Sequence, residues 1–221
     1  MDSEMSTTYN GNIQLIMGPM FAGKSTELLR RVKRYQIAKK KCLLIKYVRD
    51  DRFSKDSIAT HDNQKVVAIP TDILSKIGST IYDYDVIAVD EGQFFPDLVE
   101  FCEKAANLGK IVIVSALDGT FQRKPFPVVI DLIPLCESVV KLNAVCMICQ
   151  HDAAFSKRIT NDTATEVIGG SDMYVAVCRR CYMTDNIHNK ETLPEAKQQQ
   201  KGGMGIGFSP KKIRFVNQMM Y

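Results

Sequence analysis

Apolar residues along this chain gather into short runs, each of about the length of a buried strand. The runs occupy residues 12–17, 42–47, 85–92, 111–117 and 138–142. Each is nearly continuous in apolar residues rather than alternating with polar ones, which is typical of strands covered on both faces. The pattern therefore predicts a parallel sheet lying between two layers of helices.

Two segments between these runs repeat their apolar residues with helical spacing. The first begins at Thr26 and extends to about Lys41, and its apolar positions are Leu28, Leu29, Val32 and Tyr35. The second has Pro96 at its first helical position and closes at Gly109, with Leu98, Phe101, Cys102, Ala105 and Leu108 on one face. Residues 55–80 are mixed in character and are not assigned to an element.

The residues between the first strand and the first helix match the pattern G-x-x-x-x-G-K-[ST]. They are Gly18, Pro19, Met20, Phe21, Ala22, Gly23, Lys24 and Ser25, here called the phosphate loop. Backbone N–H groups of such a loop cradle phosphate oxygens, the lysine neutralises phosphate charge and the serine hydroxyl ligates Mg²⁺. A bare Gly/Pro turn is the alternative, but a strand before the loop and a helix after it favour an anion site.

Ligands of a parallel sheet gather at the carboxyl ends of its strands, where Asp50, Asp90, Glu91 and Asp118 fall. Asp90 is predicted to hold Mg²⁺ together with Ser25. Glu91 is predicted to align water, as in an ATPase, or to take a proton from a hydroxyl, as in a small-molecule kinase. A helix cap or a surface acid is the competing interpretation of Glu91.

His61 stands beside Asp62, a pair that invites a catalytic interpretation. A lone histidine near an aspartate is more often structural, and His61 is interpreted in that way.

Seven cysteines are distributed unevenly along the chain. Cys42, Cys102 and Cys136 stand among apolar residues and are expected in the core. The other four form two C-x-x-C pairs separated by 28 residues, and they are Cys146, Cys149, Cys178 and Cys181. Four thiolates predict a closed, structural zinc site that would hold residues 150–177 as a loop. Disulfides are the competing interpretation, although a cytosolic chain seldom keeps them.

The formal charge of the 221-residue chain is +4, but the excess lies in residues 189–221, which carry six basic and two acidic residues. The remainder is neutral and offers no electrostatic footprint for nucleic acid. The longest apolar runs are too short to span a bilayer, and the N-terminus lacks the features of a signal peptide. We therefore expect a cytosolic protein with no membrane and no nucleic-acid partner.

Four segments resemble the type II (cytosolic) thymidine kinases: GPMFAGKSTE at 18–27, DEGQFFP at 90–96, ALDGTFQRKPF at 116–126, and VIGG at 167–170 with Tyr174. The two C-x-x-C pairs fall where that family keeps its zinc, and the resemblance covers about residues 11–182. It implies an α/β fold, with a P-loop parallel sheet flanked by helices and a small zinc-tethered lasso domain. It also implies ATP-dependent, Mg²⁺-assisted phosphorylation of the thymidine 5′-hydroxyl.

The resemblance assigns a role to individual residues. Glu91 becomes the general base, and Phe121 stacks on the thymine ring. Phosphates and Mg²⁺ are held by residues 18–25 together with Asp50, Asp51, Arg52, Asp90, Glu91, Gly92 and Gln93. The nucleoside is bound by Met20, Leu117, Phe121, Ser156, Thr165, Glu166, Val167, Ile168, Gly169 and Tyr174. Without the family, Phe121 and Tyr174 are as well explained as core residues.

Three positions depart from the family pattern, namely Ala22 for serine, Thr165 for an apolar residue and Ser156 for threonine. The expected division is an extension at 1–11, a nucleotide-binding domain at 12–144, the lasso domain at 145–188 and a disordered basic tail at 189–221. The family further implies a homotetramer and feedback inhibition by dTTP. Ser209 lies in a Ser-Pro-x-Lys pattern that suits a cell-cycle kinase.

Two other functions remain open on the residues alone. One is a zinc-containing P-loop ATPase that acts on nucleic acid, which the neutral body disfavours. The other is a pure binding module built on the cysteine pairs, which leaves Lys24 and Glu91 without a purpose.

Overall fold

The structure, a computed structural model, describes residues 11–48, 67–159 and 173–184. The chain divides into two units, residues 1–189 and 190–221, and all described residues belong to the first. The positions of Asp50, Asp51, Arg52, His61, Ser209 and the segment 165–169 lie outside the described residues.

Six parallel strands form the central sheet in the order β3-β2-β4-β5-β1-β6. The strands are β1 (Asn12–Gly18), β2 (Cys42–Tyr47), β3 (Val67–Thr71), β4 (Val86–Val89), β5 (Ile111–Leu117) and β6 (Ser138–Lys141). The parallel sheet expected from the apolar runs is confirmed. In the register of β1 with β5, Gly18 pairs with Leu117, so both strands end at one edge of the sheet.

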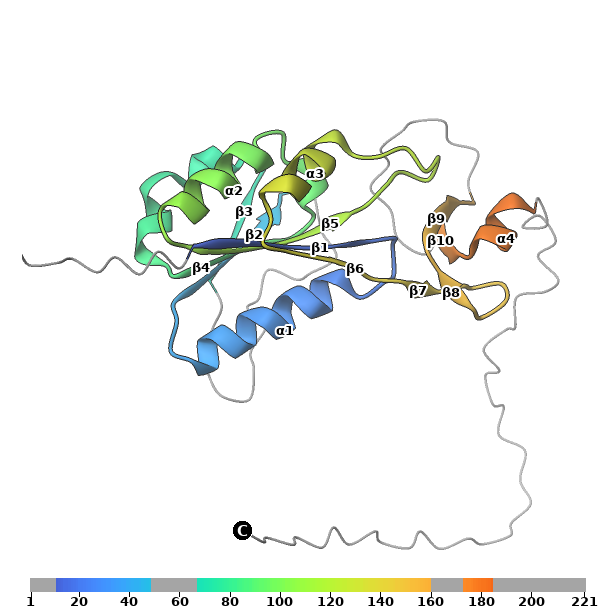
Figure 1. Cartoon of the computed structure of the whole chain (residues 1–221), viewed down its shortest axis with the longest axis horizontal. Helices are drawn as coiled ribbons and strands as arrows, with labels where there is room; N and C mark the ends of the chain where they lie inside the picture. Colours follow the sequence, from blue (N-terminus) through green and yellow to red (C-terminus); the bar gives the residue numbers. More distant parts are fainter. Residues whose placement is uncertain (1–10, 49–66, 160–172, 185–221) are drawn as a thin grey trace, which may run out of the picture. The chain divides into compact units, whose positions relative to one another are not determined.

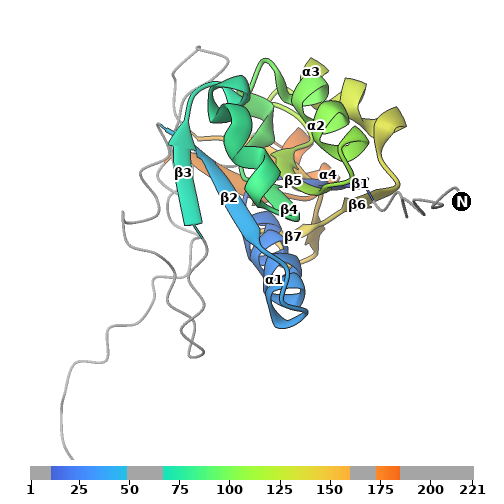
Figure 2. The same cartoon turned by 90° about the vertical axis from the view of Figure 1, so that its left-hand side faces the viewer.

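Helices cover both faces of this sheet, as Figures 1 and 2 show. Helix α1 (Lys24–Ile37) lies on one face, and α2 (Leu98–Asn107) with α3 (Pro127–Leu132) lies on the other. Successive strand residues point to opposite faces, so Ile16 packs in the cluster of Leu28 and Val32 from α1, whereas Leu15 packs in the cluster of α2. Both faces of the inner strands β4 and β5 are buried, which explains their continuous apolar runs, whereas the edge strand β6 alternates between half-buried and exposed residues.

The described residues also form three 3₁₀ segments, which are η1 (Leu74–Asp83), η2 (Gly92–Phe94) and η3 (Ile133–Leu135). Together with β3 and α3 they were not expected from the sequence. Strand β3 contains Pro70, which is tolerated because β3 lies at the edge of the sheet. Segment η1 is interrupted at Gly78, where φ is 57°, and this kink hides its helical spacing.

Two small antiparallel sheets follow the central sheet. Strand β7 (Ala144–Val145) pairs with β8 (Asp152–Ala153), and β9 (Phe155–Arg158) pairs with β10 (Tyr174–Val177), which leads into α4 (Arg179–Met183). Their buried residues form a separate cluster that includes Cys146 and Cys181. A second, cysteine-centred module was expected here, but its division from the sheet at residue 144 stays a prediction.

Several details of the expected elements were wrong. Helix α1 begins at Lys24 rather than Thr26, because the Gly23 carbonyl already accepts the first helical hydrogen bond, from Glu27 N (3.0 Å). The helix ends at Ile37 rather than near Lys41. Helix α2 begins at Leu98 rather than Pro96, and Leu108 lies beyond its end with 42% of its surface exposed. Cys42 and Cys102 are buried as expected, whereas Cys136 is only partly buried.

Candidate active site

The phosphate loop joins the end of β1 to the first turn of α1 through a backbone that glycine alone adopts easily. Gly18 has φ of 151°, and a Cβ there would lie 2.4 Å from the Leu142 carbonyl oxygen. Gly23 has φ of 78°, in the left-handed region, directly before α1 begins. The two glycines of the motif are thus required, one by close approach and one by the turn that starts the helix.

Two side chains of the loop are held inside the site. Lys24 is buried, with 8% of the residue exposed, and its ammonium donates a 2.9 Å hydrogen bond to the Pro19 carbonyl. The Ser25 hydroxyl donates to Asp90 Oδ1 at 3.0 Å. The hydroxyl and carboxylate expected to share Mg²⁺ therefore lie next to each other, and both are the oxygen ligands that Mg²⁺ prefers.

Asp90 follows β4 and is buried beneath the loop. Its Oδ1 accepts hydrogen bonds from Ser25 Oγ, from Glu91 N and from the buried Ser115 Oγ of β5. Burial raises the pKa of this carboxyl, the neighbouring Glu91 raises it further, and the hydrogen bonds from Ser115 and Ser25 oppose both effects. Ser115 was not anticipated, although a serine inside an otherwise apolar strand was a visible signal.

Glu91 is buried and has an unusual backbone, with φ of 55° and ψ of 45°. Its Oε2 accepts a 2.6 Å hydrogen bond from Gln93 Nε2, and Gln93 Oε1 in turn accepts from Leu117 N at 2.9 Å. The carboxylate is thereby oriented from the end of β5. Glu91 occupies the N-cap position of η2, but its side chain makes no capping hydrogen bond and is buried, so it is not a surface acid.

Strand β9 meets the phosphate loop through Ser156, whose hydroxyl accepts a 3.0 Å hydrogen bond from Met20 N. Ser156 and Tyr174 are both buried, and Tyr174 opens β10 beside β9. Phe121 lies in the turn bridged by Gly119 and Pro125, directly after β5. The residues expected to bind nucleoside thus come from the loop, the end of β5 and the small β9–β10 sheet.

Arg158 and Tyr182 connect these residues and were missed by sequence reasoning. The Arg158 guanidinium lies 3.9 Å from the centroid of the Phe121 ring and donates to Tyr174 Oη at 2.6 Å. Tyr182 Oη donates to the Phe121 carbonyl at 2.7 Å. No local sequence pattern indicates a role for either residue, because the residues that they contact lie far away in the sequence.

Asp118, expected at a strand end, lies next to the phosphate loop. Its backbone N–H donates to the Gly18 carbonyl at 3.4 Å, and its carboxylate forms a 2.6 Å ion pair with Lys141 of β6. The pair lies at the end of the sheet where β5, β1 and β6 adjoin.

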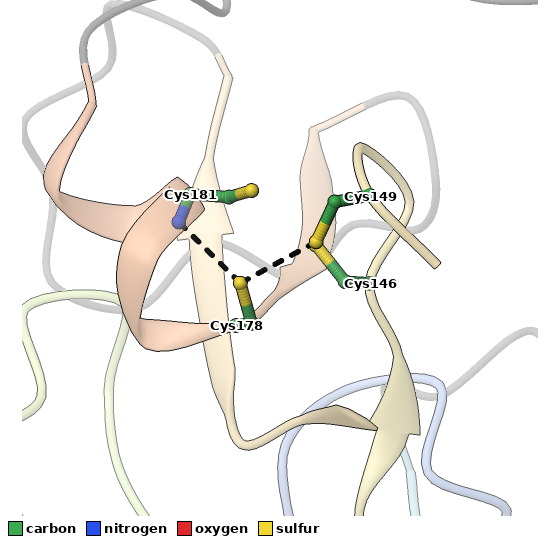
Figure 3. Close-up of side chains that lie close together, drawn as sticks. All are labelled: Cys146, Cys149, Cys178 and Cys181. Atoms are coloured by element: carbon green, nitrogen blue, oxygen red, sulfur yellow. Dashed lines mark hydrogen bonds between the residues drawn. The ribbon is translucent and has the colours of Figure 1, made fainter. Parts of the chain in front are cut away.

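Figure 3 shows the four cysteines of the two C-x-x-C pairs converging from the turn after β7 and from the start of α4. Their sulfur atoms all lie within 4.8 Å of one another, and Cys149 Sγ is 3.6 Å from Cys178 Sγ. A tetrahedral zinc with Zn–S bonds of about 2.3 Å implies sulfur separations of about 3.8 Å. The cluster fits a structural Zn²⁺, and its thiols are free rather than paired as disulfides.

Backbone hydrogen bonds favour the ionised form of one of these thiols, that of Cys146. Burial raises the pKa of Cys146, but backbone hydrogen bonds from Cys149, Cys178 and Ile148 outweigh it and lower that pKa to about 6. A thiolate is therefore accessible near neutral pH, and thiolate is the form that ligates zinc.

The sequence of residues 11–182 matches the thymidine kinase family. The chain belongs to the thymidine kinase family. It is 60% identical over 174 residues to the thymidine kinase of Myxoma virus (strain Lausanne), covering 79% of this chain and 97% of the viral one. It is also 60% identical over 173 residues to the thymidine kinase of Vaccinia virus (strain Ankara), covering 78% and 97%. The family and the ATP-dependent kinase class predicted from the sequence are confirmed.

The structural comparison adds less. The flagellar accessory protein FlaH from Methanocaldococcus jannaschii matches 70% of this chain and 75% of its own, with a TM-score of 0.47 and 17% identity, a likeness that carries no argument. Within residues 11–48, 67–159 and 173–184, none of the helices combines the length and apolar character needed to cross a bilayer.

Proposed function

We propose that this thymidine kinase family member transfers the γ-phosphoryl group of ATP to the 5′-hydroxyl of thymidine, yielding dTMP and ADP. One observation carries the proposal. A buried glutamate, Glu91, is oriented by a 2.6 Å hydrogen bond from Gln93 and stands directly after Asp90, which is bonded to the phosphate-loop Ser25. A base held beside a phosphate site is the arrangement that phosphoryl transfer to an alcohol needs.

The phosphates of ATP are assigned to the phosphate loop, with Gly92 and Gln93 close by. Lys24 would neutralise the β- and γ-phosphates, and Ser25 and Asp90 would hold Mg²⁺, whose charge offsets that of the transferring group. Asp50, Asp51 and Arg52 are assigned near the same group from the sequence.

Glu91 is assigned as the general base. It takes the proton of the thymidine 5′-hydroxyl while the hydroxyl oxygen forms its bond to the γ-phosphorus and the bond to the ADP oxygen breaks. The hydrogen bond from Gln93 to Oε2 fixes the orientation in which the carboxylate would receive that proton.

The nucleoside is assigned to the wall formed by Met20, Leu117, Phe121, Ser156 and Tyr174. Phe121 would stack on the thymine ring, and backbone groups of residues 165–169 would hydrogen-bond the base. The structural zinc at the cysteine cluster would hold the strands that carry this wall, because zinc sites contribute directly to folding.

Further expectations follow from the family alone. These are action on deoxyuridine, inhibition by dTTP, a homotetramer, a cytoplasmic location and modification of Ser209 by a cell-cycle kinase. None of them is needed for the chemistry proposed here.

The test is an assay of the purified protein with ATP and Mg²⁺, given either thymidine or single-stranded DNA. We expect equal amounts of ADP and dTMP with thymidine and no stimulation by DNA. Glu91→Gln should bind ATP normally and lose about 10²–10⁴-fold in kcat, since the amide keeps the shape but accepts no proton. ADP formation that depends on DNA and not on thymidine would replace the proposal with a nucleic-acid ATPase.

A further inference from the structure

We propose that Arg158 is a positioning residue for the nucleoside, which holds Phe121 and Tyr174 together as one rigid wall. The inference rests on the proposed function, because it takes these two residues as nucleoside contacts. It assigns to Arg158 a role through its neighbours rather than through contact with the reacting atoms.

The contacts of Arg158 join two distant segments. Arg158 closes β9 and is 8% exposed. Its guanidinium carbon lies 3.9 Å from the centroid of the ring of Phe121, a residue of the turn after β5. Its Nη2 donates a 2.6 Å hydrogen bond to Tyr174 Oη. Tyr174 is its partner in the β9–β10 ladder. One guanidinium therefore fixes both a ring and a hydroxyl.

Arginine is suited to this double task because its guanidinium is planar. It can stack on an aromatic face while its N–H groups donate within the plane. The guanidinium occupies one face of Phe121, so a thymine ring that stacks on Phe121 must use the opposite face. Arg158 thereby decides which side of the ring receives the base and keeps the ring from turning.

The backbone of Phe121 is held separately. Tyr182 Oη donates to its carbonyl at 2.7 Å, from the residue that follows the zinc-ligand candidate Cys181. Loss of Arg158 should therefore remove the stacking contact on Phe121 and the hydrogen bond to Tyr174 Oη without releasing the turn. This separation makes a defect in nucleoside binding measurable in a folded protein.

The experiment uses the full chain with its metal and compares Arg158→Met and Arg158→Lys with the wild type. We expect the KM for thymidine, and its Kd by calorimetry, to rise roughly tenfold in both variants, since each loses the stacked planar donor. The KM for ATP, the zinc content and the melting temperature should stay near the wild-type values. Lysine should not rescue, because a compact ammonium cannot stack and donate at once.

Arg179→Met is the matched control. Arg179 also lies over an aromatic ring, 5.0 Å from the centroid of Phe155, and Phe155 is not one of the proposed nucleoside residues. Arg179 is exposed, and its replacement should leave the KM for thymidine unchanged. Tyr174→Phe removes only the hydroxyl, and combined with Arg158→Met it should add little further loss, since both changes break one connected unit.

The outcomes separate this inference from the proposed function. Wild-type protein that forms no ADP with thymidine would refute both. An active wild type whose Arg158→Met variant keeps its thymidine KM, or loses ATP and thymidine binding equally, would overturn the positioning role alone. If the Arg158→Met variant does not fold, the Arg158→Lys and Tyr174→Phe variants test the positioning role instead. Unchanged thymidine binding in both of them would also overturn that role.

Discussion

Asp90, as the proposed Mg²⁺ ligand, would serve chemistry at the expense of stability. Burial raises its pKa, as does the neighbouring Glu91, so the ionised form that Mg²⁺ needs is disfavoured in the folded protein. An acid whose pKa is raised on folding destabilises the protein above that pKa, and the penalty vanishes as pH falls below the unfolded value. Stability and the proposed metal binding therefore favour opposite protonation states of this carboxyl.

Asp90→Asn should consequently stabilise the protein at neutral pH while lowering turnover by about 10–100-fold or more. The amide oxygen can still accept the hydrogen bonds from Ser25 and Ser115. The measurement is the urea midpoint of variant and wild type without Mg²⁺ from pH 7 to pH 4, and the advantage of the variant should shrink toward the acid end. The exposed Asp131→Asn serves as control. An advantage that does not change with pH would contradict this account.

Replacement of Gln93 tests whether the orientation of Glu91, the proposed base, matters for turnover. Gln93→Met keeps the volume of the side chain but removes both its donor to Glu91 and its acceptor for Leu117 N. We expect kcat to fall by about 10–100-fold with little change in the KM for ATP, and the acid limb of the kcat–pH profile to move. Steady-state kinetics from pH 5 to 9 measure both effects. A rise in the KM for ATP at constant kcat would instead make Gln93 a phosphate ligand.

At the scale of single residues, the candidates that the sequence identifies are those that belong to a local motif. Lys24, Ser25, Asp90 and Glu91 belong to such motifs, and the structure brings them to one edge of the sheet. Ser115 was missed because it supports Asp90 from a neighbouring strand. A contact between side chains of neighbouring strands can be predicted only when the order of the strands in the sheet is known, and the sequence does not reveal that order.

At the scale of elements, η2 is pressed closely against the sheet at Gly92. A Cβ at this position would lie 2.7 Å from Val114 Cγ1, on a buried strand residue with a stiff branched side chain. Gly92→Ala should therefore destabilise the protein by about 1–3 kcal/mol through overpacking. Val114→Ala removes the clashing methyl group. In a protein that carries this change, Gly92→Ala should leave the free energy of unfolding nearly unchanged. Urea unfolding of the four proteins measures the coupling, and purely additive losses would refute the contact.

Strands with a continuous apolar run were predictable, and elements without such a signal were not. The apolar runs of β1, β2, β4 and β5 are continuous, so their length and burial are visible in the sequence. Strands β7 and β8 have two residues each, and their pairing is set by the cysteine-centred cluster rather than by their own composition. Their existence therefore follows from contacts between segments distant in the chain.

At the scale of the whole molecule, the described part of the chain has a sheet core and a cysteine-centred core made of different residues. The second core holds β9 and β10, which carry Ser156, Arg158 and Tyr174. The phosphate loop is built between β1 and α1, whose residues pack in the sheet core. On the proposed function, nucleoside binding would therefore depend on the second core more strongly than ATP binding would.

Cys146→Ser separates these two dependences. Zinc binding contributes about 10–16 kcal/mol to the folding of small zinc peptides, so removal of one thiolate should release the metal and loosen the second core. Metal analysis should find zinc in the wild type and little in the variant. By equilibrium dialysis, thymidine binding should be lost while ATP binding is largely kept. Cys136→Ser is the matched control, because Cys136 lies outside the cluster and donates to the Leu132 carbonyl (3.2 Å), a bond that serine can also make. Equal loss of ATP and thymidine binding in Cys146→Ser would show that the two cores do not act separately.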